Sequence, residues 1–248
     1  MYKKTLIAAV LSMLITTCAN ALPSMQIDYD VDVTNDSGIT MDTLWNRTGK
    51  YEEKVITIGS KLLYDNNINK RVPFVVDRSK ELNARSSLCY KVVSINKGLL
   101  PYIDNDDEMA FIIGHEIAHS LDAYGGYFKW IAMNFRSKHY EYKSDLASID
   151  LMVKSGYNPV AAITCANKWM PEEQYDLFST HPKTSKRLME IYKYISVNYP
   201  WALKSSMTSN IHYINFKRSM DRDIKDFEYK TAQKELKKQQ KTKSKSKI

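Results

Sequence analysis

The chain has 248 residues, with 36 lysines and arginines against 28 aspartates and glutamates, a formal net charge of +8. The last 19 residues, 230–248, hold eight lysines and one glutamate, whereas residues 22–229 hold 26 basic and 27 acidic residues. This distribution excludes a nucleic-acid-binding protein with a basic body, and the length suits one globular domain with a real core.

Residues 1–21 have the pattern of an export signal. Lys3 and Lys4 precede an apolar run, Leu6 to Ile15, and residues 19–21 read Ala-Asn-Ala. A positive start, a short apolar core and an A-x-A site are typical of a cleaved signal peptide. We expect cleavage after Ala21 and a protein that is periplasmic or secreted.

A second interpretation of the same segment makes Cys18 the lipid-attachment residue of a lipoprotein. The residues before it, Ile15-Thr16-Thr17, only loosely resemble a lipobox, because a residue smaller than Thr17 is usual there. No later stretch is long and apolar enough to span a bilayer, so no transmembrane segment is expected after signal removal, and the mature protein should be soluble.

The region before the histidines predicts a loose arm, a helix and a small sheet. Residues 22–49 are polar and irregular, and we expect an N-terminal arm ahead of a main domain at 50–229. Residues 51–66 carry apolar side chains at 55, 58, 62 and 63, which is helical spacing. The β-branched runs 72–76 and 90–95 predict two strands, joined by the polar stretch 83–87.

Residues 108–122, EMAFIIGHEIAHSLD, contain the pattern HExxH at His115, Glu116 and His119. Residues four apart lie on one face of a helix, so both imidazoles can reach one metal ion, with Glu116 placed to take a proton from water. The surrounding pattern is itself helical, with Asp106 or Asp107 as the expected cap and Gly125-Gly126 as the expected stop. We therefore predict a Zn²⁺ site on this helix.

A catalytic zinc needs a third protein ligand. The downstream candidates are His139, Glu141, Asp145 and His181. Glu141 lies 22 residues after His119 and begins a predicted helix, 141–156, on which Glu141 and Asp145 share a face. One carboxylate could ligate the metal while the other holds a ligand histidine through its second ring nitrogen.

The C-terminal part predicts two packing helices and a disordered tail. The helices are expected at 159–170, capped by Asn158, and at 185–198, followed by a mixed pattern at 211–229. Residues 230–248 are too charged to fold, and we expect a solvated tail that makes at most weak contact with an anionic surface. After signal removal two cysteines remain, Cys89 and Cys165, which either form a disulfide or stay buried and unpaired.

Between residues 72 and 195 the chain resembles the zinc metallopeptidases related to the CaaX prenyl proteases and the HtpX-like heat-shock proteases, especially their soluble exported bacterial members. The resemblance rests on an ordered series of motifs: Leu82-Asn83-Ala84, Lys97-Gly98-Leu99-Leu100, Asp107-Glu108-Met109-Ala110, HExxH, Glu141-Tyr142-Lys143-Ser144-Asp145, Lys154-Ser155-Gly156-Tyr157-Asn158-Pro159, and Ser179-Thr180-His181-Pro182 with Arg187. HExxH alone occurs in many unrelated proteases, whereas the series is far more specific.

The resemblance implies that Glu141 is the third zinc ligand, that Asp145 supports the ligands, and that His181 lies near the metal with an active-site role. His139 and His212 match no ligand position. The chain departs from the family pattern at Lys143 and Ser144, where Glu and Ala are usual, and in residues 85–89, which lack the usual glycine pair.

The implied fold is α+β and mainly helical, a zincin-like domain of gluzincin type with a small sheet or hairpin before the HExxH helix. The implied activity is that of a zinc metalloendopeptidase acting on unfolded or misassembled envelope proteins, with no specific nucleic-acid partner. Two alternatives are a catalytically silent, zinc-bearing binding protein and a polyanion-binding protein that acts through its tail. The intact Glu116 argues against the first, because a silent metal site needs no base.

Overall fold

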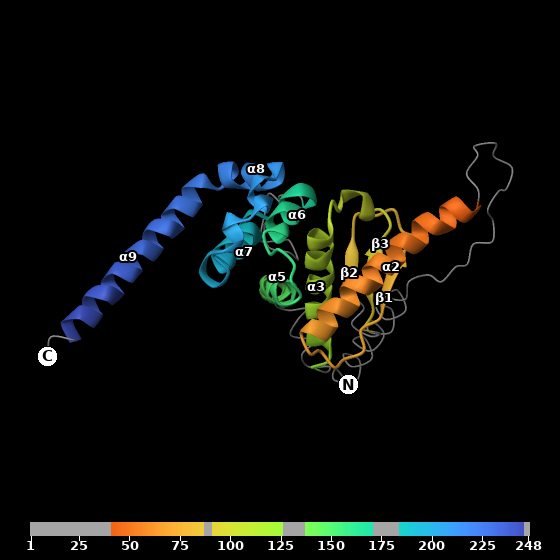
Figure 1. The fold of residues 1–248 in the computed structure, drawn as a ribbon, viewed down its shortest axis with the longest axis horizontal. Helices are drawn as coiled ribbons and strands as arrows, with labels where there is room; N and C mark the ends of the chain where they lie inside the picture. The colour runs from red at the N-terminus through yellow and green to blue at the C-terminus, as the bar shows by residue number, and fades with distance from the viewer. Residues whose placement is uncertain (1–40, 87–90, 126–136, 171–183, 246–248) are drawn as a thin grey trace, which may run out of the picture. The chain divides into compact units, whose positions relative to one another are not determined.

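The structure, a computed structural model, describes residues 41–86, 91–125, 137–170 and 184–245 (Figure 1). The predicted export signal, Cys89 and His181 lie outside these ranges. Contacts divide the chain into two units, Met1–Tyr157 and Asn158–Ile248, which are described separately. None of the helices within the described ranges combines the length and the apolar character needed to cross a membrane.

Within the described residues, the first unit joins three helices to a small sheet, and the second unit is helical (Figure 1). This confirms the α+β, mainly helical class. The elements of the first unit are α2 (Met41–Asp65), β1 (Phe74–Asp77), β2 (Ala84–Ser86), β3 (Val93–Asn96), the 3₁₀ turn η1 (Leu100–Tyr102), α3 (Asp106–Ala123) and α5 (Ser137–Lys154).

The sheet has the order β1-β3-β2, so β3 is central and the other two strands are edges. β1 pairs with β3 in parallel, with Phe74 beside Val93, and β2 pairs with β3 antiparallel, with Arg85 beside Ser94. The two predicted strands are present, but the polar stretch 83–87 was expected as a connection and contains β2 instead. Strand formation depends strongly on having a partner, which β3 supplies and the sequence of 84–86 does not reveal.

Helix α2 begins ten residues earlier than the spacing of apolar residues from 51 predicts, so the end of the expected arm, 41–49, is helical. Its inner face is formed by Val55, Ile58 and Leu62, which are buried as predicted. Gly59 faces Phe74 of β1 so closely that a Cβ atom would lie 2.6 Å from the ring. This helix therefore packs directly on the sheet.

Helix α3 is capped by Asn105, one residue before the predicted caps. Its Oδ1 accepts a hydrogen bond from the backbone N–H of Glu108 at 2.9 Å, and the Glu108 carboxylate accepts one from the N–H of Asp104 at 3.0 Å. Asp106 and Asp107 instead lie in the first turn, where negative charge stabilises a helix start. The correction follows from the extended backbone of Asn105, which gives its short side chain the geometry of a cap.

Helices α3 and α5 lie in close contact, and Gly114 makes this possible. A Cβ atom on Gly114 would lie 2.6 Å from Oγ of Ser148, which donates a hydrogen bond to the carbonyl of Phe111 at 2.7 Å. Helix α5 starts four residues before Glu141 and ends just before Gly156, whose φ of +77° suits the predicted glycine stop. The contact fixes how far the side chains of α5 stand from those of α3.

Replacing Gly114 with alanine should destabilise the protein, because the clash with Ser148 outweighs the gain of about 1 kcal/mol in helix propensity. Overpacking of this kind costs about 1–3 kcal/mol, measurable as a lower midpoint of denaturant unfolding. Gly49→Ala in α2 is the matched control, since nothing lies within 4 Å of its added Cβ. The pair Gly114→Ala with Ser148→Ala should recover part of the loss, and a single Gly114→Ala variant as stable as the parent would contradict the close contact.

The second unit contains α6 (Ala161–Trp169), α7 (Thr184–Asn198), α8 (Ile211–Ser219) and α9 (Asp221–Lys245), with the 3₁₀ turns η2 (Ala202–Lys204) and η3 (Ser206–Ser209) before α8. Helix α6 begins two residues after the predicted Pro159, because Asn158 closes a turn by accepting from the N–H of Val160. Cys165 on α6 is fully buried, and because Cys89 lies outside the described residues, both alternatives, a disulfide and two unpaired cysteines, stay open.

The predicted disordered tail differs from the structure, in which α9 continues to Lys245. Lysine, glutamine, glutamate and alanine all have high helix propensity, and ion pairs four residues apart, Lys225 with Asp221 and Lys230 with Asp226, support the first half. The charge that argues against a packed core does not prevent a single exposed helix.

Candidate metal centre

His115 and His119 lie on one face of α3, with a ring nitrogen of each directed to the same point. One helical turn separates His115 from His119, and their Nε2 atoms lie 3.0 Å apart, with the rings at 74° to each other. Both side chains are only partly exposed, at 12% and 14%. The spacing predicted from HExxH is therefore realised in the structure.

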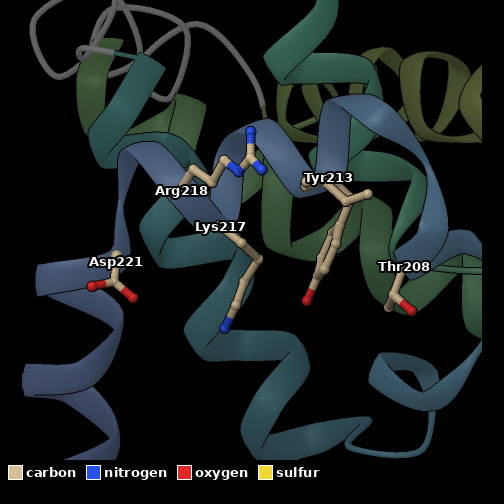
Figure 2. A pocket seen from close by; sticks show the side chains of 6 residues that line it. Thr208, Tyr213, Lys217, Arg218 and Asp221 are labelled. Carbon is tan, nitrogen blue, oxygen red and sulfur yellow. The ribbon is translucent and has the colours of Figure 1, made fainter.

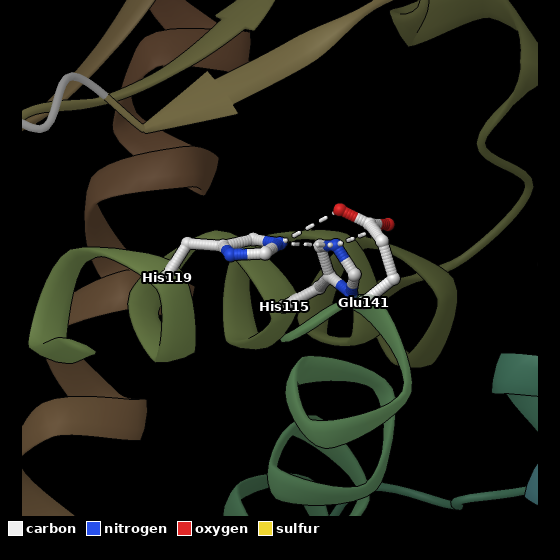
Figure 3. Close-up of side chains that lie close together, drawn as sticks. All are labelled: His115, His119 and Glu141. Carbon is white, nitrogen blue, oxygen red and sulfur yellow. Dashed lines mark hydrogen bonds and ion pairs between the residues drawn. The ribbon is translucent and has the colours of Figure 1, made fainter. Parts of the chain in front are cut away.

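Glu141 reaches the same point from α5 (Figure 3). Its Oε1 lies 3.2 Å from Nε2 of His119, and its Oε2 lies 3.6 Å from Nε2 of His115. Ligands held tetrahedrally at about 2.0–2.2 Å from zinc stand roughly 3.3–3.6 Å from one another. The three side chains fit a zinc ion, and two imidazoles with one carboxylate form a donor set typical of catalytic zinc.

Asp145 stands behind this group, on the same face of α5 and one turn after Glu141. Its Oδ1 lies 2.9 Å from Nδ1 of His115, the ring nitrogen that points away from the other two ligands, and its side chain is 1% exposed. A carboxylate in this place fixes the orientation and the tautomer of a ligand histidine. Asp145 thus has the position expected of the supporting residue.

Glu116 precedes His119 by three residues on α3 and is nearly buried, at 9% exposure. Burial lowers the pKa of His119, but the hydrogen bond with Glu141 and the negative charges of Glu116, Glu141 and Asp145 outweigh it, so the pKa rises above its ordinary value of 6.5. Because a ligand histidine must be neutral to bind zinc, protonation of His119 competes with metal binding.

A second ion pair joins the two helices one turn from the ligands. Nζ of Lys143 lies 2.5 and 2.7 Å from the two oxygens of Asp122, which is nearly buried near the end of α3. Lys143 is one of the departures from the family pattern, and its partner was not predicted from the sequence. Such a pair could be found in advance only by aligning the two helices in space.

His139 and His212 are not in this cluster. His139 is exposed in the first turn of α5, with its ring beside Tyr140, and His212 lies on α8 in the second unit. His181 lies outside the described residues, so its place near the metal stays a prediction. Of the four downstream candidates, the structure brings Glu141 and Asp145 to the histidines.

Replacing Asp145 with asparagine should weaken zinc binding about 10- to 100-fold, because outer partners of ligand histidines contribute on that scale. Competition with a chelating dye measures the affinity. Asp150→Asn, the same change later on α5, is the control and should leave the affinity unchanged. Equal zinc affinity in Asp145→Asn and the parent would show that the contact with His115 does not orient the ligand.

A protein-family model described as peptidase family M48 matches the chain over residues 50–124 and 121–195. The two matches together cover more than half of the chain. They include the three candidate ligands, His115, His119 and Glu141, and the neighbouring residues Glu116 and Asp145. Comparisons with curated proteins and with solved structures gave no match.

Proposed function

Because this chain belongs to peptidase family M48, a family of zinc metallopeptidases, we propose that it is an exported zinc endopeptidase that cleaves unfolded or misassembled proteins of the cell envelope. The observation that carries this proposal is the convergence of His115, His119 and Glu141 on one point, with Glu116 on the same helix. The small sheet beside α3 suits a zincin-like domain, and Glu141 as the third ligand suits the gluzincin type.

The chemistry follows from the residues around that point. When bound by the two histidines and Glu141, zinc supplies a water of lowered pKa and polarises the scissile carbonyl. The carboxylate of Glu116 accepts the proton from the attacking water and delivers it to the nitrogen of the leaving amine. Asp145 keeps the ring of His115 in place throughout.

Substrate binding on this proposal uses the edge of the sheet. β2 is an edge strand and packs against α3, the helix that carries the histidines. An extended peptide can pair with such an edge through its backbone, which selects unfolded chains and reads few side chains. The export signal of residues 1–21 supports a place in the periplasm or outside the cell.

The substrate class is tested with one protein in two states. A disulfide-containing substrate should be cleaved at least tenfold faster after reduction and alkylation than in its folded form, because a folded chain offers no extended segment to the edge strand. Gel electrophoresis over time measures both rates. A short unstructured peptide cut at the same rate in both conditions serves as the control, and equal cleavage of the two protein forms would count against quality control.

A further inference from the structure

Helix α9 is anchored at its beginning within the second unit. Ile224 is buried, at 2% exposure, and the ring of Phe227 lies 6.4 Å from that of Tyr192 on α7. The hydroxyl of Tyr192 donates a hydrogen bond to Glu228 at 2.8 Å. These contacts set the direction in which the rest of α9 leaves α7 and α8 (Figure 1).

A pocket lies beside this anchor (Figure 2). The residues that line it include two cations and one anion: Thr208, Tyr213, Ile214, Lys217, Arg218 and Asp221. Lys217 extends toward Tyr192, with its Nζ 3.3 Å from the hydroxyl, and Arg218 is exposed. The start of α9 is therefore flanked by positive charge on α8.

The second half of α9 extends beyond the other described elements of the second unit. Every side chain that the structure describes between Ala232 and Gln240 is exposed. Lys230, Lys234 and Lys237 fall at spacings of four and three, which places them in one row along the helix, the lysine row. Lys230 also pairs with Asp226, one turn earlier. Like charges at these spacings repel, so an anionic partner would stabilise this part of the helix.

Two large apolar side chains lie next to the lysine row. Tyr229 is 66% exposed and Leu236 is 52% exposed, and because they are seven residues apart they share one face of the helix. Their exposure is costly beside a charged row unless a partner has an apolar layer under its charges. A lipid surface has this layering, with anionic headgroups above an apolar interior, whereas a nucleic-acid backbone does not.

We propose that α9 from Tyr229 onward is an arm that binds an anionic lipid surface, with the lysine row on the headgroups and Tyr229 and Leu236 inserted between them. The anchored start of α9 fixes the arm to the second unit. This inference is independent of the proposed peptidase activity, since it uses no residue of the metal cluster.

The test is sedimentation of the full chain with vesicles of phosphatidylcholine alone or containing 30% phosphatidylglycerol. Binding to the anionic vesicles should fall on the order of 100-fold when the three lysines of the row become glutamine, at about fivefold for each lysine. The matched control changes the same three residues to arginine, which keeps the charge and should keep the binding. Residues 1–21 would bind vesicles in every variant and hide part of the loss, so the same variants are also compared in chains that begin at Leu22, after the expected cleavage site.

The variant Leu236→Gln distinguishes binding to a lipid surface from binding to other polyanions. On a lipid surface this change should weaken binding severalfold without changing its dependence on salt, because it removes an inserted side chain and no charge. Thermal unfolding confirms that each variant is folded. Equal binding of the glutamine and parent chains would overturn the proposal, as would tighter binding to duplex DNA than to anionic vesicles with no effect of Leu236→Gln.

Discussion

Replacing Glu116 with glutamine is expected to abolish cleavage of an unfolded protein while one zinc per chain remains bound. Glutamine keeps the size of the side chain but cannot accept a proton, and loss of a positioned general base reduces rates about 10²- to 10⁴-fold. The ligands His115, His119 and Glu141 are unchanged, so metal content should equal that of the parent. The measurements are the rate of substrate loss and the zinc content of the same samples.

Glu52→Gln is the matched control for this experiment. Glu52 lies on α2 with an exposed side chain, and the same loss of one negative charge there should leave the rate unchanged. Glu116→Gln with full zinc and parental activity would show that another group takes the proton. Loss of zinc in the variant would instead assign Glu116 to metal binding.

If the unmodified protein does not cleave the substrate, a variant at His181 should be tested. The family resemblance implies that this residue lies near the metal, where it could occupy the position that a substrate or water needs. His181→Ala should then release activity that Glu116→Gln removes again. Inactivity of both the parent and His181→Ala would favour the zinc-bearing binding protein over the peptidase.

The parts of this structure that depend on local spacing were predictable from the sequence. The four-residue interval between His115 and His119 fixes their common face, and Gly156 stops α5 because its positive φ suits glycine. Even the local errors are small, as with Asn105 capping α3 in place of the aspartates that follow it. Such features need no knowledge of what lies across the core.

The parts of the structure that depend on contacts between distant residues were harder to predict from the sequence. Helical spacing places Glu141 and Asp145 on one face of α5, but only the close contact at Gly114 and Ser148 brings that face to α3. The family resemblance selected Glu141 among four candidates, because spacing could not. The predictions for residues 84–86 and for the tail were wrong for opposite reasons. Residues 84–86 form β2 because β3 pairs with them, which their own sequence does not indicate. The described part of the tail remains helical although it packs into no core.

Replacing Glu141 with alanine should remove both zinc and activity. This change deletes a ligand, so its effect on zinc affinity should exceed the 10- to 100-fold loss typical of outer partners such as Asp145. Glu52→Ala on α2 is the control, and equilibrium dialysis against buffered zinc measures both. Zinc affinity equal to that of the parent would transfer the role of third ligand to another residue, with His181 the first to examine.

The same variant gives a readout that needs no metal. In the zinc-free protein, Glu141 raises the pKa of His119 through its hydrogen bond and its charge, so its removal should lower that pKa below the parental value. Titration of the imidazole signals by NMR follows this directly. A raised pKa stabilises the fold at acidic pH and this contribution disappears as pH rises through it, so the zinc-free variant should lose stability relative to the parent below a pH of about 6.5. Loss of zinc together with this shift would show that Glu141 faces His119 in solution, which a merely unfolded variant could not show.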